Sequence, residues 1–108
     1  IIGDTNFMFK GAIAENYVAE ELNTMRIPLI YWKSRGDAEI DFLLTTSEGI
    51  IPIEVKASLR VQSKSLNIYM DKFQPKYGIR LSTKNFGFEN KVKSIPLYAT
   101  FCLSDLKN

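Results

Sequence analysis

The chain has 108 residues, of which 45% are hydrophobic and 24% charged, and its formal net charge is +2. This length suits one domain with a single modest core. The sequence has no histidine and one cysteine, Cys102. These counts exclude Ser-His and Cys-His nucleophilic systems, histidine-ligated metals, an internal disulfide and a cysteine zinc site. If the chain is an enzyme, its chemistry therefore rests on carboxylates, lysines, hydroxyls and a metal.

Nothing in the sequence predicts secretion or membrane insertion. No apolar run approaches the ~18 residues of a membrane span, and no signal peptide is visible. We therefore expect a cytoplasmic protein without a membrane partner. The chain begins with Ile1 rather than methionine, which predicts that residues 1–108 form a single domain of a longer protein.

The first predicted element is a helix over 11–26, after a lead-in of ten residues without a clear period. Its apolar stripe has helical spacing and consists of Ala14, Val18, Leu22 and Met25. Pro28 follows and ends the helix. Glu15 and Glu21 flank the two edges of the stripe. The helical wheel does not choose between them, and either one fits a solvated helix flank.

A short strand over 29–33 and a polar turn over 34–37 lead into a predicted hairpin over 38–56. Apolar residues alternate with other residues along both strands, at Ile40, Phe42, Leu44, Ile51, Ile53 and Val55. This period of two places each set on its own face of a sheet. Pro52 lacks a backbone donor, so it requires a bulge or an edge-like position.

The register of this hairpin follows from its turn. Residues 45–49 are typical of a turn, and folding about them places Leu44 opposite Ile51. The same register places Asp41 opposite Glu54, with Cβ atoms roughly 4.5–5.5 Å apart. Two carboxylates therefore meet on one face of the hairpin.

This pair of acids predicts a metal site. Carboxylates at such a distance repel, so a proton or a cation has to lie between them. Mg²⁺ is the expected occupant, because it takes hard oxygen ligands and keeps several waters. Lys56 projects from the same face as Glu54 and could orient a metal-activated water or stabilise charge on phosphorus. Alternatively, the charges form a solvated sheet face, although the repelling pair of Asp41 and Glu54 then has no evident structural use.

The second half of the chain completes an α/β pattern. A helix capped by Ser63 ends at Pro75, and a strand follows over 77–82. Residues 83–92 are predicted as a loop, before a last short strand over 93–96 and a short amphipathic helix. The order is α-β-β-β-α-β, which implies a parallel crossover and a central mixed sheet flanked by helices.

These residues resemble two groups of proteins. A helix with Glu15, then Asp41, then Glu54-Val55-Lys56 resembles the PD-(D/E)xK nuclease superfamily, which has a restriction-endonuclease-like fold. The segments KGAIAENYVAEEL, YWKSRGDAEIDF, IPIEVKAS and IPLYATFCL look like the C-terminal domain of a group of prokaryotic AAA+ ATPases. The resemblance covers the chain from Lys10 to Leu103.

The resemblance implies a restriction-endonuclease-like domain that cleaves DNA with Mg²⁺, or with Mn²⁺, as part of an AAA+ ATPase. It implies that Asp41 and Glu54 bind the metal, that Lys56 is the catalytic lysine, and that Glu15 rather than Glu21 completes the catalytic set.

Basic residues near the expected edge of the site are candidate DNA contacts: Lys33, Arg35, Arg60, Lys64 and Arg80. Two alternatives remain open. The domain could be a non-catalytic DNA-binding or oligomerisation module of the ATPase, and a homo-oligomer is possible, since a fold does not imply a function. Its charged face could also be a docking surface for a partner protein.

Overall fold

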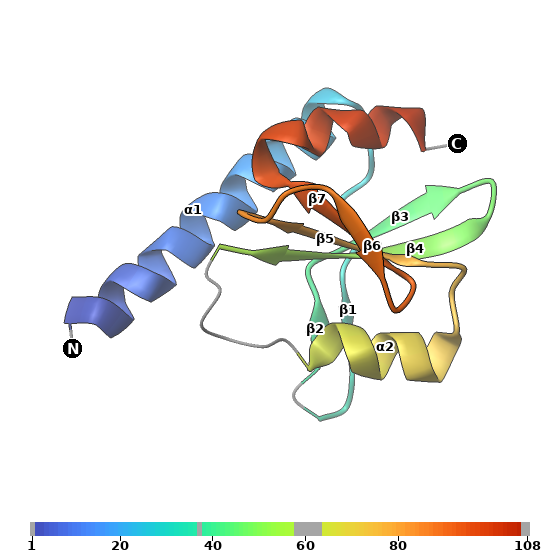
Figure 1. Cartoon of the computed structure of the whole chain (residues 1–108), viewed down its shortest axis with the longest axis horizontal. Helices are drawn as coiled ribbons and strands as arrows, with labels where there is room; N and C mark the ends of the chain where they lie inside the picture. Colours follow the sequence, from blue (N-terminus) through green and yellow to red (C-terminus); the bar gives the residue numbers. More distant parts are fainter. Residues whose placement is uncertain (1, 37, 58–63, 107–108) are drawn as a thin grey trace.

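The computed structural model describes residues 2–36, 38–57 and 64–106, with the side chains of residues 2–10 left out. Its elements in chain order (Figure 1) are α1 (Ile2–Thr24), β1 (Trp32–Lys33), β2 (Glu39–Ile40), β3 (Phe42–Thr46), β4 (Gly49–Lys56), α2 (Ser65–Phe73), β5 (Gly78–Ser82), β6 (Gly87–Glu89), β7 (Val92–Pro96) and the 3₁₀ helix η1 (Leu97–Asp105). Among the residues described, no helix combines the length and apolarity that a membrane crossing requires.

A five-stranded mixed sheet in the order β3-β4-β5-β7-β6 forms the centre of the molecule. The inner pairs β4–β5 and β5–β7 are parallel, and the outer pairs β3–β4 and β6–β7 are antiparallel. The strands β1 and β2 form a separate antiparallel pair. The structure thus confirms an α/β chain with a central mixed sheet flanked by helices.

Helices cover both faces of the sheet (Figure 1). Helix α1 and η1 pack on one face, and α2 packs with the β1–β2 pair on the other. The larger core lies under α1 and η1 and includes Val18, Leu22, Ile53, Ile79 and Leu103. A smaller core under α2 consists of Ile40, Leu66, Tyr69 and Val92. Even positions of β4, such as Glu54, therefore face α2, because the odd positions fill the larger core.

The predicted hairpin register is confirmed, since Leu44 pairs with Ile51. Pro52 pairs with Leu43, whose N–H donates outward to the carbonyl of Ile30 at 2.7 Å. The pair of Leu43 and Pro52 is therefore a non-hydrogen-bonded one. Pairing of β4 with β5 begins only at Ile53. Pro52 thus needs no donor on either side, which explains how a proline fits this strand.

Several local predictions from the sequence were wrong, among them the strand over 29–33, of which only Trp32–Lys33 forms a strand. Helix α1 begins at Ile2 rather than near residue 11, because a nucleated helix extends at little cost through a segment without proline. The first hairpin strand bends at Asp41, so Ile40 turns into the smaller core. Strand β6 forms inside the predicted loop over 83–92. The predicted cap Ser63 lies outside the described residues.

Candidate functional site

Glu54 is a buried carboxylate on the α2 face of β4, with an exposed fraction of 7%. The parallel register places it beside Arg80 of β5. Arg80 donates from Nε to Oε2 of Glu54 at 2.8 Å. The negative charge of Glu54 is therefore compensated by a guanidinium on the next strand, as a buried charge requires.

Asp41 occupies the bend before β3, one step beyond the last β3–β4 pair and opposite Glu54. The N–H of Val55 donates to Oδ2 of Asp41 at 2.8 Å. In a continued ladder that N–H would bond to the carbonyl of Ile40. The carboxylate of Asp41 thus replaces a backbone acceptor where the chain leaves the sheet.

The carboxyl group of Asp41 belongs to a cluster of three acids. Its pKa is raised to about 7, first by burial and then by the carboxyl groups of Glu15 and Glu54, while the hydrogen bond from the N–H of Val55 opposes the rise. Glu15 also lies within hydrogen-bonding range of Asp41. Protonation of Asp41 relieves the repulsion that its acidic neighbours create.

Helix α1 brings Glu15, rather than Glu21, to this cluster. Glu15 follows the buried Ala14, and α1 packs against β4. Glu21 instead accepts a hydrogen bond from Tyr17, and this bond adds to burial in raising the pKa of that phenol. The structure therefore places Glu15 near Asp41 and Glu21 beside Tyr17, while the chemical role of Glu15 stays a prediction.

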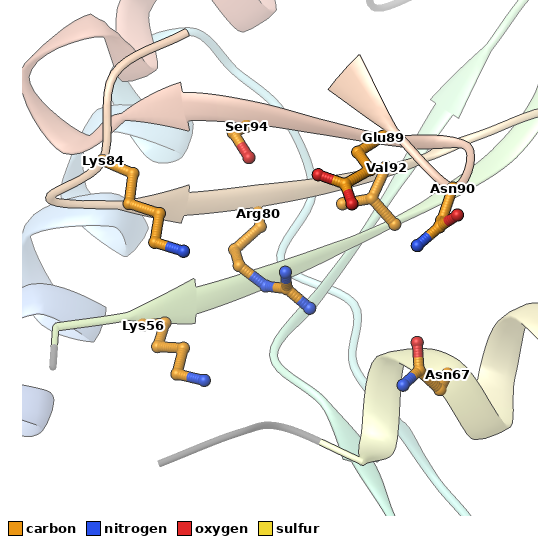
Figure 2. A pocket seen from close by; sticks show the side chains of 8 residues that line it. All are labelled: Lys56, Asn67, Arg80, Lys84, Glu89, Asn90, Val92 and Ser94. Atoms are coloured by element: carbon orange, nitrogen blue, oxygen red, sulfur yellow. The ribbon is translucent and has the colours of Figure 1, made fainter. Parts of the chain in front are cut away.

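Lys56 ends β4 on the same side as Glu54 and lines a pocket between the sheet and α2 (Figure 2). Burial lowers the pKa of Lys56, Glu54 opposes this effect, and the positive charges of Arg80 and Lys84 add to it. The ammonium thus lies among other cations, and the negative charge of Glu54 partly compensates it.

The two predicted metal ligands fit a magnesium ion only in a water-rich site. Within residues 2–36, 38–57 and 64–106, no group of three or more His, Cys, Asp or Glu side chains is arranged to hold a metal. Mg²⁺, however, is usually bound through one or two carboxylates and keeps several waters. Asp41 and Glu54 supply that number, and metal binding would displace a proton from Asp41.

The predicted DNA contacts fall into different environments. Lys33 is exposed, and its Nζ lies 3.9 Å from Oε1 of Glu39. Arg35 and Lys64 are also exposed. Arg80 is half-buried and bonded to Glu54, so it is not a free surface cation. Arg60 lies outside the described residues.

One basic residue of this region, Lys84, was not predicted from the sequence. It lies in the predicted loop and lines the pocket with Lys56 and Arg80. The position of Lys84 just after a strand could have indicated it. Strands β4, β5 and β7 are parallel, and their last pairs join Lys56 to Ser82 and Ser82 to Pro96. Polar residues that follow the carboxyl ends of neighbouring parallel strands meet at one edge of a sheet.

The chain was compared with protein families, curated proteins and solved structures. A family model described as a domain of unknown function, DUF4143, matches residues 10–100. The matched segment contains Glu15, Asp41, Glu54 and Lys56. No curated protein and no solved structure matched. Because the match spans most of its length, the chain belongs to the DUF4143 family of domains of unknown function.

Proposed function

We propose that this domain is a restriction-endonuclease-like nuclease of the PD-(D/E)xK type, which cleaves phosphodiester bonds of DNA with Mg²⁺ or Mn²⁺. One observation carries the proposal: Asp41, in the bend before β3, lies near Glu15 of α1 and near Glu54 of β4, and Glu54 in turn lies near Lys56. Asp41 has its pKa raised to about 7 there by burial and by its acidic neighbours. A carboxyl group whose pKa is raised by burial and by acidic neighbours marks a candidate functional site, and two carboxylates are enough for a water-rich magnesium site.

Each residue has a distinct part in this proposal. Asp41 and Glu54 would hold the metal, which would supply a Lewis acid and a water of lowered pKa. The N–H of Val55 fixes the orientation of Asp41. Lys56 stabilises charge that develops on the phosphoryl group. Glu15 would add negative charge near Asp41 and so favour a cation there.

The fold and the larger protein belong to the same proposal. A mixed sheet with the acids at the junction of an antiparallel and a parallel pair is consistent with a restriction-endonuclease-like core. Together with the resemblance of the four sequence segments, this supports a domain attached to an AAA+ ATPase in the cytoplasm, acting on DNA.

The ion pair of Glu54 and Arg80 favours a second candidate, a non-catalytic DNA-binding module. A guanidinium already compensates Glu54 at 2.8 Å, and Asp41 has a structural use as the acceptor for Val55. In this candidate the acids stabilise the fold, and the basic residues contact phosphates without any cleavage.

A cleavage assay separates the two candidates. We expect the wild-type chain, alone and within its full-length ATPase, to cut linear, branched or single-stranded DNA with Mg²⁺ or Mn²⁺ and to stop in EDTA. Asp41→Asn should abolish cleavage, because an amide is a weaker metal ligand. Glu48→Gln is the matched control, since Glu48 is an exposed acid in the hairpin turn.

The enzyme proposal is wrong if the wild type cuts none of these DNA forms with either metal. It is also wrong if Asp41→Asn cuts as fast as Glu48→Gln, because the activity would then come from elsewhere.

A further inference from the structure

The pocket beside the acid cluster has the composition of a phosphate site. It measures about 300 Å³ and lies between the sheet and α2 (Figure 2). Lys56, Arg80 and Lys84 supply three cations from β4, β5 and the segment that follows β5. Glu89, on the β6 side, is the only carboxylate among its lining residues in the described chain. The pocket therefore favours an anion.

Arg80 is held in a fixed orientation at the centre of this pocket. Its Nε is bonded to Glu54 at 2.8 Å, and Glu54 is itself buried. Figure 2 shows the guanidinium of Arg80 directed into the space between the strands and α2. Its two Nη groups remain as donors toward the pocket, and a guanidinium fixed in this way matches the geometry of phosphate oxygens.

Neutral donors complete the lining. Asn67 of α2 and Ser94 of β7 line the pocket from opposite sides of the cations. An amide and a hydroxyl each add a hydrogen bond that a phosphate oxygen accepts. A phosphate monoester, which carries close to two negative charges at neutral pH, compensates the cations better than a diester, which carries one.

We propose that this pocket binds a phosphate monoester, of the kind that terminates a nucleic-acid strand. Glu89, on the β6 side of the pocket, would repel a further phosphate, so the pocket suits a terminal group better than a phosphate within a continuing strand. The choice of a nucleic-acid end as the source rests on the proposed function, whereas the recognition of a phosphate monoester does not.

The test is a binding titration of the full chain in EDTA, where cleavage cannot occur. The probes are short single-stranded DNAs that are identical except for a 5′-phosphate, a 3′-phosphate or hydroxyls at both ends, together with adenosine monophosphate. We expect one of the phosphorylated probes to bind about tenfold more tightly than the hydroxyl-ended DNA, the gain of one or two charge-assisted hydrogen bonds. Adenosine monophosphate should compete with it.

A pair of lysine variants makes the test specific. Lys84→Gln should remove most of this preference, whereas Lys76→Gln should leave it unchanged, because Lys76 is exposed and does not line the pocket. Preference for the 5′ or the 3′ end identifies the source, and competition by the mononucleotide alone points to a free nucleotide. Equal affinity for phosphorylated and hydroxyl-ended probes, with no binding of the mononucleotide, would overturn the proposal. Equal effects of the two lysine variants would overturn it as well.

These outcomes are independent of cleavage. A protein that cuts DNA without preferring phosphorylated ends keeps the proposed function and loses this inference. A protein that binds monoesters but never cuts keeps the inference and loses the proposed function.

Discussion

Lys56→Ala is expected to reduce divalent-dependent DNA cleavage on the order of a hundredfold or more, as for the loss of other single preorganised donors. Lys56 lies at the end of β4, beside Glu54 and on its face of the sheet. Its ammonium would act on charge that develops in the transition state, whereas the affinity for DNA comes from phosphate contacts spread over several basic residues. The fold and most of the affinity for hydroxyl-ended DNA should therefore remain.

The measurement compares single-turnover cleavage rates with binding of the same hydroxyl-ended DNA. Lys64→Ala is the control, because Lys64 is exposed at the start of α2. We expect Lys64→Ala to weaken DNA binding modestly. Its single-turnover cleavage rate, measured with saturating protein, should not change. Lys56→Ala could instead lower the affinity for DNA as Lys64→Ala does and keep the cleavage rate within a few-fold of the wild-type rate. In that case Lys56 is only a phosphate contact.

Arg80→Ala is expected to destabilise the domain by roughly 3 kcal/mol, the lower end of the cost of breaking a buried ion pair. Glu54 keeps an exposed fraction of only 7%, so it cannot regain its hydration when its partner is removed. Lys56 lies close enough to compensate part of the charge, which is why we expect the lower value. Urea unfolding at neutral pH measures the free energy directly.

A double variant identifies the cause of this loss. In Arg80→Ala with Glu54→Gln, the buried side chain is neutral, so part of the lost stability should return. Lys76→Ala, at an exposed site, should change the free energy of unfolding by about 0.5 kcal/mol or less. If Arg80→Ala costs no more than this control, the ion pair does not stabilise the fold.

The sequence alone was sufficient to predict the hairpin, because the residues that determine its register lie close together in the chain. Residues alternate with period two on both strands, and a slip of one residue would move Leu44 and Ile51 out of the core, so the register is strongly determined. Because this register follows from the alternation and the turn alone, it also places Asp41 opposite Glu54. The parallel crossover through α2 followed from the order of the elements.

The features that the sequence did not predict depend on contacts between segments that are distant in the chain. Glu54 and Arg80 are 26 residues apart and meet through a parallel register that no turn fixes. Strand β6 has only three residues, all of them exposed, so it lacks the buried face that makes a strand visible in a sequence. The bend at Asp41 depends on the smaller core, where Ile40 packs with Leu66 and Tyr69.

Calorimetry with Mn²⁺ is the most direct test of a metal site at Asp41 and Glu54. We expect the wild type to bind Mn²⁺ at about pH 8 and at least roughly tenfold more weakly at about pH 5.5. The reason is that the pKa of Asp41 is raised to about 7, so a falling pH protonates the carboxylate that the metal needs. Asp41→Asn should show no comparable binding at either pH. Equal Mn²⁺ affinity in the wild type and in Asp41→Asn, or binding by the wild type that does not change between the two pH values, would contradict a metal site at Asp41 and Glu54.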